Sequence, residues 1–263
     1  MAPLPAQERR ARGAVVGIRL VRVILHLLRG LAICALLFPF AGAALRERRI
    51  RSWSAGLLAI LRVRVKIVPE NSSFPALPAL VVANHVSWLD VFVINALQPC
   101  RFVAKADIRA WPALGWLCAR AGTIFIARGR QREVRRVYQG LVNGLRAGGH
   151  IAFFPEGTTA MQGNLLPFHA NLFEAAIESR TPVLPCALRY VDAQGRLHPG
   201  VDFVGDTSFV ASLITVLKTA PVTAELAVLP AIPAAGAHRR ELAQQARAAI
   251  AQALQLPAAN GAS

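Results

Sequence analysis

Apolar runs of strand length alternate with helical segments through most of this chain, and this alternation constrains its fold more than any other feature. The expected strands are short, apolar and bounded by turn residues, whereas the expected helices repeat apolar residues every three or four positions. Strands that alternate with helices predict an α/β fold in which helices flank a mixed, largely parallel sheet. The expected strands are Ala79–Ala83, Arg101–Lys105, Thr123–Ile126, Ile151–Phe154, Val183–Tyr190 and Ala224–Leu229, and the expected helices include residues 91–97, Gln131–Arg146 and Arg239–Leu254.

Positive charge is concentrated in the first quarter of the chain. The net charge is +16, and residues 1–66 carry 12 Arg and one Lys against Glu8 and Glu47, a net +11. Such an asymmetry indicates a polyanionic partner. Because apolar residues are interleaved with the arginines and no nucleic-acid-binding motif is visible, the expected partner is an anionic phospholipid membrane and not nucleic acid. Arginine outnumbers lysine by 27 to 3 in an Ala-rich chain, which is typical of a bacterial source.

The N-terminal segment combines a basic helical face with an uncharged run. Apolar residues share the helix surface with five basic residues at helical spacings, as in a helix that lies in a membrane interface with its arginines toward headgroup phosphates. These residues are Arg12, Arg19, Arg22, His26 and Arg29. The next 16 residues, Gly30–Leu45, are uncharged and contain Pro39. A helical hairpin that enters one leaflet is the first interpretation, a transmembrane helix over residues 23–45 is an alternative, and a signal peptide is a third.

These patterns divide the chain into three parts. Residues 1–66 form a basic, apolar, membrane-associating helical segment, residues 67–256 form the α/β domain, and residues 257–263 form a flexible tail. Arginines at positions 46, 48, 49 and 51 follow the uncharged run and favour a cytoplasmic location for the α/β domain. The expected location is therefore the cytoplasmic side of a bacterial inner membrane.

A histidine and an aspartate lie five positions apart in Asn84-His-Val-Ser-Trp-Leu-Asp90. We expect His85 in a turn between a strand and a helix, and Asp90 in the first turn of that helix, with Ser87 as the N-cap. A histidine titrates near neutral pH, and a carboxylate can fix its tautomer and stabilise its cation. The pair therefore corresponds to two members of a catalytic triad, and the missing nucleophile suggests that the attacking hydroxyl belongs to the substrate. The alternative is structural, with Asp90 as a helix-capping acid and His85 as a polar turn residue.

Three further motifs follow this pair. Gly122-Thr-Ile-Phe-Ile-Ala-Arg128 presents a guanidinium suited to binding phosphate. Phe154-Pro-Glu-Gly-Thr-Thr159 offers backbone N–H groups, threonine hydroxyls and the carboxylate of Glu156. Thr181-Pro-Val-Leu-Pro-Cys-Ala187, which contains Val183-Leu-Pro185 and two prolines, alone indicates only an irregular edge of a buried strand. Sites in α/β sheets gather at the carboxyl ends of strands, where the turns that hold His85 and Glu156 are expected.

In this order and spacing, the four motifs resemble those of the glycerolipid acyltransferase family, the lysophospholipid acyltransferases typified by 1-acylglycerol-3-phosphate O-acyltransferase. The family patterns are NHxSxxD, GxxFIxR, FPEGTxS and a proline-rich VxP strand, and the resemblance covers roughly residues 75–230. It implies a glycerol-3-phosphate acyltransferase-like α/β fold with a membrane-docking N-terminal hairpin. It also implies catalytic residues His85 and Asp90, and substrate-binding residues Lys105, Arg128, Glu156, Gly157 and Thr158. The residues that support the motifs are Asn84, Ser87, Gly122, Phe125, Phe154, Pro155 and Pro185.

The reaction that this resemblance implies is transfer of a fatty acyl group from acyl-CoA or acyl carrier protein to the free hydroxyl of a lysolipid. His85 acts as general base, backbone N–H groups of its turn hold the oxyanion, and neither a metal nor another cofactor is implied. The first expected acceptor is 1-acyl-sn-glycerol-3-phosphate, which gives phosphatidic acid. Because Thr159, Ala160 and Met161 stand where many phosphatidate-forming members have Arg and Ser, lyso-ornithine lipid and lysophosphatidylcholine are alternative acceptors. A thioesterase and a non-catalytic lipid-binding protein are remote alternatives, the former without a G-x-S-x-G motif in the chain.

Overall fold

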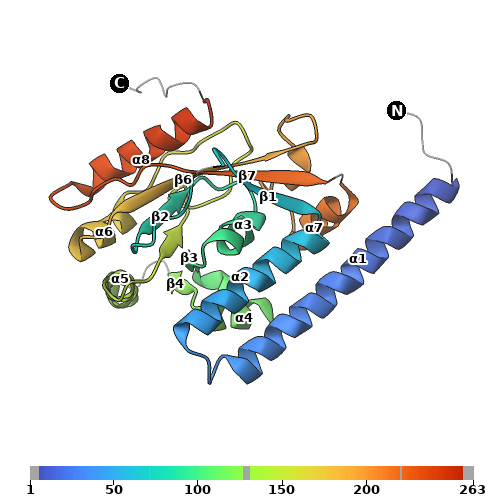
Figure 1. Ribbon diagram of the computed structural model, residues 1–263, viewed down its shortest axis with the longest axis horizontal. Coiled ribbons are helices and arrows are strands. Elements are labelled where there is room, and N and C mark those ends of the chain that lie inside the picture. Colours follow the sequence, from blue (N-terminus) through green and yellow to red (C-terminus); the bar gives the residue numbers. More distant parts are fainter. Residues whose placement is uncertain (1–5, 71, 127–130, 220, 257–263) are drawn as a thin grey trace.

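A computed structural model describes residues 6–70, 72–126, 131–219 and 221–256 of the protein. Its strands are β1 (Val63–Ile67), β2 (Leu80–Ala83), β3 (Arg101–Lys105), β4 (Ile124–Ile126), β5 (Ile151–Phe153), β6 (Val183–Val191) and β7 (Val222–Val228). Within the described residues they form a seven-stranded sheet in the order β1-β7-β6-β2-β5-β3-β4. Neighbouring strands are parallel except β6 and β7, which are antiparallel. The predicted mixed, largely parallel sheet is confirmed (Figure 1).

Helices cover both faces of this sheet (Figure 1). The longer ones are α1 (Ala6–Ala32), α2 (Ala43–Ile60), α3 (Leu89–Leu97), α5 (Gln131–Arg146), α7 (Phe209–Lys218) and α8 (Arg239–Ala253). The shorter ones are η1 (Ile33–Leu37), η2 (Ala106–Ala110), α4 (Leu114–Arg120), η3 (Asn171–Phe173), α6 (Glu174–Ser179) and η4 (Pro199–Val201). One core lies between the sheet and α2, α3 and α7, and a second core lies between the sheet and α5, α6 and α8.

Strand β2 shows how this layering follows from the sequence. Val81 and Ala83 belong to the first core, whereas Leu80 and Val82 belong to the second. Successive side chains of a strand point to opposite faces, so a strand covered on both faces reads as a continuous apolar run. The turn that follows β2 is therefore held at the centre of the sheet, between the parallel neighbours β5 and β6.

Strand β1 was not predicted. It pairs only with β7 among the described residues, and its charged residues Arg64 and Lys66 alternate with apolar ones. A strand at the edge of a sheet needs fewer apolar residues than a central one. The division that the sequence indicates at residue 66 falls inside this strand.

Pro185 lies in a buried strand at the point where regular pairing with β7 ends. Pro185 belongs to β6, which lies between β2 and β7 and not at the edge of the sheet. The antiparallel ladder with β7 begins only at Cys186, opposite Val228, and the Pro185 carbonyl then accepts a hydrogen bond from the Leu229 N–H. Proline lacks an N–H donor, and it is tolerated here because the regular ladder with β7 has already ended.

The N-terminal segment folds as a helical hairpin in which α1 and α2 lie side by side (Figure 1). His26 and Trp53 join the two helices through stacked rings, with ring centroids 4.8 Å apart. The Trp53 indole N–H donates to the His26 carbonyl at 3.0 Å, and a Cβ added at Gly56 would lie 2.7 Å from the His26 ring. The glycine therefore allows the close contact between the helices.

The orientation predicted for two basic residues of α1 is also wrong. His26 is buried against α2, and the Arg19 guanidinium donates to the carbonyl of Leu217 in α7 at 2.9 Å. The outward face of α1 is instead apolar, with exposed Ile18, Val21, Ile24, Leu25 and Leu28. Helical periodicity gives the angular separation of side chains but does not tell which side another helix covers.

Candidate active site

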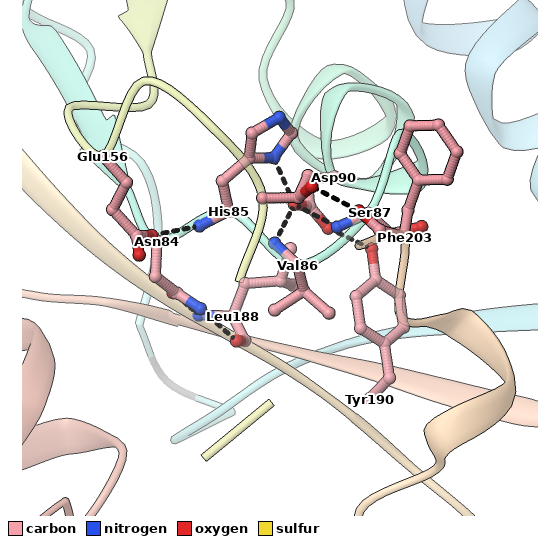
Figure 2. A network of polar contacts seen from close by, with 10 residues as sticks. Asn84, His85, Val86, Ser87, Asp90, Glu156, Leu188, Tyr190 and Phe203 are labelled. Atoms are coloured by element: carbon pink, nitrogen blue, oxygen red, sulfur yellow. Dashed lines mark hydrogen bonds and ion pairs between the residues drawn. The ribbon is translucent and has the colours of Figure 1, made fainter. Parts of the chain in front are cut away.

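His85 and Asp90 meet in the turn between β2 and α3, at the carboxyl end of the central strand (Figure 2). The His85 ring nitrogen Nδ1 lies 2.8 Å from Asp90 Oδ2, and the Asp90 side chain is fully buried. A carboxylate accepts hydrogen bonds, so this contact assigns the ring proton to Nδ1. Among the described residues, no hydrogen bond reaches the other ring nitrogen, Nε2. Nε2 is therefore available as a proton acceptor.

The Asp90 carboxylate also organises the turn that precedes α3. Its Oδ2 accepts the backbone N–H groups of Val86 and Ser87, at 2.7 and 3.0 Å, while its Oδ1 accepts the phenol of Tyr190 at 2.6 Å (Figure 2). The catalytic and the structural interpretations of Asp90 are thus compatible, because one carboxylate holds both the turn and the imidazole.

The capping role predicted for Ser87 is wrong. Helix α3 begins at Leu89 with Trp88 at the N-cap, without a capping side-chain hydrogen bond. The Ser87 hydroxyl is buried and has no hydrogen-bond partner among the described residues. The Asp90 carboxylate does accept the Ser87 N–H at 3.0 Å, as the acid of a capping box does, but the reciprocal bond from the serine hydroxyl is not formed.

Asn84 fixes the start of this turn to strand β6. Its side-chain amide donates to the Leu188 carbonyl at 2.9 Å and accepts the Leu188 N–H at 2.8 Å (Figure 2). The amide thereby continues the β2–β6 ladder past Ala83, which is opposite Cys186. This pairing explains an asparagine directly before the histidine, since a shorter or acidic side chain cannot both donate and accept here.

The third motif begins with Phe154, whose ring packs on the His85 ring, and Pro155. The rings of Phe154 and His85 stack at 3.8 Å with an angle of 5° between their planes, and Phe102 lies behind Phe154 at 5.8 Å. Pro155 is buried, and its carbonyl accepts the His169 N–H at 2.9 Å. The stacked phenylalanine restricts rotation of the imidazole and keeps Nε2 pointed away from Asp90.

The Glu156 carboxylate contacts the backbone of two loops. Oε1 accepts the His85 N–H at 2.7 Å, and Oε2 accepts the Leu166 N–H at 2.8 Å. Burial raises the pKa of Glu156, against the opposite effect of these two hydrogen bonds and of the His85 ring. The contacts describe a brace between two loops, while the predicted contact with the acceptor head group stays a prediction.

The remaining residues of the third motif line the same loop. Gly157 has φ of +70°, and a Cβ there would lie 3.3 Å from the His169 ring. Thr158 is exposed, whereas the Thr159 hydroxyl donates to the carbonyl of Phe203. The side chain at position 159, where many phosphatidate-forming members have arginine, is therefore turned to the protein backbone.

Three backbone N–H groups of the histidine turn already have carboxylate partners. The N–H groups of His85, Val86 and Ser87 all donate to carboxylates, those of Glu156 and Asp90. A donor already bonded to a carboxylate does not stabilise a developing oxyanion without losing that bond. Which backbone N–H groups hold the oxyanion therefore stays a prediction.

The second motif contributes less to the described site. Lys105 ends β3 with an exposed side chain, and its backbone pairs with Ile126 of β4. Gly122 has φ of +90° in the turn before β4, and the guanidinium of Arg109 lies over the Phe125 ring at 6.0 Å. Arg128 lies outside the described residues. Lys105 shares the carboxyl edge of the sheet with His85, without a hydrogen bond to the dyad among the described residues.

An apolar cavity adjoins the site, between the N-terminal hairpin and the α/β domain. Its volume is about 700 Å³ including its open mouth. The hairpin contributes Ile33 and Trp53, and α3 contributes Val91 and Phe92. Phe102 lines the cavity and also contacts Phe154, the residue stacked on His85. The cavity therefore begins next to the aromatic residues that position the histidine.

Sequence patterns did not reveal Tyr190, Phe102 or the Leu188 backbone as parts of the site. Tyr190 was placed only as the end of an expected strand, and the partner of its hydroxyl lies 100 positions away in the chain. A tyrosine hydroxyl in a largely apolar strand was the available signal, because buried hydroxyls are normally hydrogen-bonded.

Comparisons with known proteins agree with this geometry. A family model described as Acyltransferase matches residues 66–189. The lyso-ornithine lipid O-acyltransferase of Pseudomonas aeruginosa is 39% identical over 210 residues, which cover 80% of each chain. A 1-acyl-sn-glycerol-3-phosphate acyltransferase of Neisseria meningitidis is 39% identical over 154 residues, 57% of this chain and 59% of that one. The crystal structure of the 1-acyl-sn-glycerophosphate (LPA) acyltransferase PlsC from Thermotoga maritima has a TM-score of 0.62, with 18% identity, and covers 90% of this chain and 96% of that chain.

The fold, the His85–Asp90 pair and these matches define an O-acyltransferase. More narrowly, the chain belongs to the family of lysolipid acyltransferases that includes 1-acylglycerol-3-phosphate acyltransferase. The predicted family is therefore confirmed, and with it the prediction that the protein is an enzyme.

Proposed function

We propose that this protein transfers a fatty acyl group from a thioester, carried by coenzyme A or acyl carrier protein, directly to the hydroxyl of a lysolipid. The observation that carries the proposal is the His85–Asp90 contact, which leaves Nε2 as a proton acceptor, with an apolar cavity on the far side of Phe154 and Phe102. Nε2 takes the proton of the lysolipid hydroxyl while the oxygen attacks the thioester carbonyl. The tetrahedral intermediate collapses, the new ester forms, and the departing thiolate receives the proton from the imidazolium. No acyl-enzyme is needed.

The apolar cavity is the proposed site for an acyl chain. Burying each methylene group of such a chain contributes about 0.8 kcal/mol. The walls come from the N-terminal hairpin, α3 and α4, together with Phe102. A chain in this cavity has its end directed toward the Phe102–Phe154–His85 stack, where the reacting carbonyl must lie.

The outward face of α1 is the proposed membrane-docking surface. Its exposed apolar side chains are continued by Leu36 and Phe40, which are 75% and 88% exposed. Exposed arginines at positions 22, 29, 46, 48, 49 and 51 flank this surface and suit anionic headgroups. The cytoplasmic face of a bacterial inner membrane is the proposed location.

Docking in one leaflet agrees better with the packing than a transmembrane helix does. Residues Gly13–Leu37 are long and apolar enough to cross a membrane. However, the same helix packs against α2 and α7, and Arg19, in the first third of the span, donates to the Leu217 carbonyl. A membrane crossing would bring these contacts into the bilayer core, where a charged side chain is costly.

The proposed acceptor is lyso-ornithine lipid. Relatives of that name from Pseudomonas aeruginosa and Rhodobacter capsulatus align with 80% and 76% of this chain. Thr159 replaces the arginine that a phosphomonoester head group favours, and its hydroxyl is bonded to the Phe203 carbonyl. The second candidate is 1-acyl-sn-glycerol-3-phosphate, which the Neisseria relative and the exposed Lys105 favour.

A panel of acceptors tests the proposal. The purified protein on anionic vesicles receives labelled acyl-CoA or acyl carrier protein, together with lyso-ornithine lipid, lysophosphatidate, lysophosphatidylglycerol or lysophosphatidylcholine. We expect the highest kcat/KM with lyso-ornithine lipid. A preference for lysophosphatidate selects the second candidate. Release of the thiol without an acylated lipid contradicts acyl transfer and identifies a thioesterase.

A further inference from the structure

Tyr190 is a fully buried residue of β6 whose hydroxyl reaches the catalytic carboxylate (Figure 2). Its phenol donates to Asp90 Oδ1 at 2.6 Å. Its backbone is also fixed, because its N–H donates to Gln162 at 2.6 Å and its carbonyl accepts the His198 N–H at 2.9 Å. The tyrosine hydroxyl is therefore presented to Asp90 by a rigid central strand.

The two oxygens of Asp90 have unequal sets of partners. Oδ2 accepts the His85 ring and the N–H groups of Val86 and Ser87. Among the described residues, the only hydrogen bond to Oδ1 comes from Tyr190. A buried carboxylate oxygen without a partner is costly, and a hydrogen bond to a carboxylate is stronger than one between neutral groups. Tyr190 therefore determines both the rotation of the carboxylate and the charge left on it.

The phenol remains a donor under any condition in which the enzyme works. Burial, the charge of Asp90 and the hydrogen bond to it raise the pKa of Tyr190 well above its usual value. The hydroxyl accordingly keeps its proton, and its one donor is directed at Asp90.

Strand β6 holds both ends of the histidine turn. Leu188 binds Asn84 at the start of the turn through its backbone, and Tyr190 binds Asp90 at the end through its side chain. These two positions of β6 face the motif from the same strand. The strand therefore sets the position of the carboxylate relative to the base.

We propose that Tyr190 is a positioning residue for acyl transfer, which orients Asp90 toward His85 and moderates its negative charge. This inference rests on the proposed function of His85 and Asp90. Removing the hydroxyl leaves more charge on Asp90 to stabilise the imidazolium, so a higher pH is needed to obtain the free base. It also frees the carboxylate to rotate, which slows the chemical step without changing the binding of the acceptor.

The test is Tyr190→Phe, which keeps the ring and its packing. We expect kcat to fall about ten-fold, the effect of one charge-assisted hydrogen bond, with an acceptor KM close to that of the unaltered protein. We also expect the acid limb of kcat/KM against pH to move to higher pH. Tyr138→Phe is the matched control, because the chain contains two tyrosines and Tyr138 lies on α5 in the other core. It should change neither kcat nor the acid limb.

A fluorinated form of the protein should shift the acid limb in the opposite direction while Tyr190 keeps its hydroxyl. In the Tyr138→Phe background, Tyr190 is the sole tyrosine, so growth on 3-fluorotyrosine labels this position alone. The fluorinated phenol is a stronger donor and should move the acid limb to lower pH. The KM and the position of the limb do not depend on the folded fraction, so reduced yield of either protein does not obscure the result.

The outcomes separate this inference from the proposed function. The role of Tyr190 is overturned, while acyl transfer stands, if the acid limb does not shift in either Tyr190→Phe or the fluorinated protein. It is also overturned if activity falls only as much as the folded fraction does. Absence of transfer by the unaltered protein overturns the proposed function itself. Opposite shifts in the two proteins support the positioning role.

Discussion

Replacing Glu156 with glutamine distinguishes a structural brace from a head-group ligand. Glu156 is 4% exposed, and its oxygens accept the N–H groups of His85 and Leu166 at 2.7 and 2.8 Å. Glutamine has the same shape but only one oxygen. One backbone N–H therefore loses its acceptor and faces an NH₂ group instead.

The size of the effect follows from these two contacts. A hydrogen bond to a charged group contributes about 1.5–3 kcal/mol, and loss of the buried charge offsets part of this amount. We expect Glu156→Gln to lower the free energy of unfolding by about 2 kcal/mol, which corresponds to a fall in Tm of roughly 4–8 °C for a domain of this size. Because one bond holds the backbone of the base, kcat should fall about ten-fold or more with little change in acceptor KM.

The assay pairs thermal unfolding with steady-state kinetics on vesicles. Glu178→Gln is the matched control, since the Glu178 side chain is 38% exposed and lies 3.9 Å from Arg146. Its change in unfolding free energy should stay within about 0.5 kcal/mol. An unchanged Tm for Glu156→Gln, together with a raised acceptor KM, would show that Glu156 binds the head group and would refute the brace.

The same variant has a defined pH dependence. Burial raises the pKa of Glu156 in the folded protein. The folded state then binds this proton more tightly than the unfolded state, where the value is about 4.3. As pH falls through the raised pKa toward that value, the unaltered protein should gain stability relative to Glu156→Gln. A stability difference that narrows over this range contradicts the assignment.

Two further variants test the turn and the docking surface. Asn84→Asp places an oxygen where an NH₂ group now donates to the Leu188 carbonyl at 2.9 Å, so we expect a loss of about 3 kcal/mol in unfolding free energy, against no loss for the exposed Asn143→Asp. Wild-type stability in Asn84→Asp contradicts the role of this amide. The pair Leu25→Glu and Leu28→Glu should weaken partition to anionic vesicles at least about ten-fold, because it removes two exposed leucines from the proposed membrane-docking surface. Glutamates at exposed Leu77 and Leu197 are the control, and equal partition of both pairs argues against docking through α1.

The sequence predicted the parts of the fold that depend on local patterns. Strand β3 and helix α5 have the predicted bounds, Arg101–Lys105 and Gln131–Arg146. In both segments the spacing of the apolar residues and the residues at the two ends indicate the element clearly. Strand β1 was missed because Arg64 and Lys66 interrupt its apolar residues, and an edge strand needs no continuous apolar run.

The sequence identified the central residues of the site, but it did not show which groups most of them contact. The motif placed His85 beside Asp90, which the structure brings within 2.8 Å. It did not show that Glu156 binds backbone, because a carboxylate and a glycine in a turn suit an anion-binding loop equally well. Nor did it show the contact of Tyr190, since hydrogen bonds between strands distant in sequence depend on the order of strands in the sheet. For α1, periodicity grouped Arg19 with the other basic residues, and only the packing of α7 showed its direction.

The most direct test of the account compares His85→Ala with the unaltered protein on the same vesicles. Acylated lysolipid and released thiol are both measured in each reaction. The account predicts equal amounts of the two products from the unaltered protein. For His85→Ala it predicts a rate lower by about 10²-fold or more, with unchanged vesicle binding. Transfer retained by His85→Ala at a comparable rate would contradict the assignment of His85 as the base.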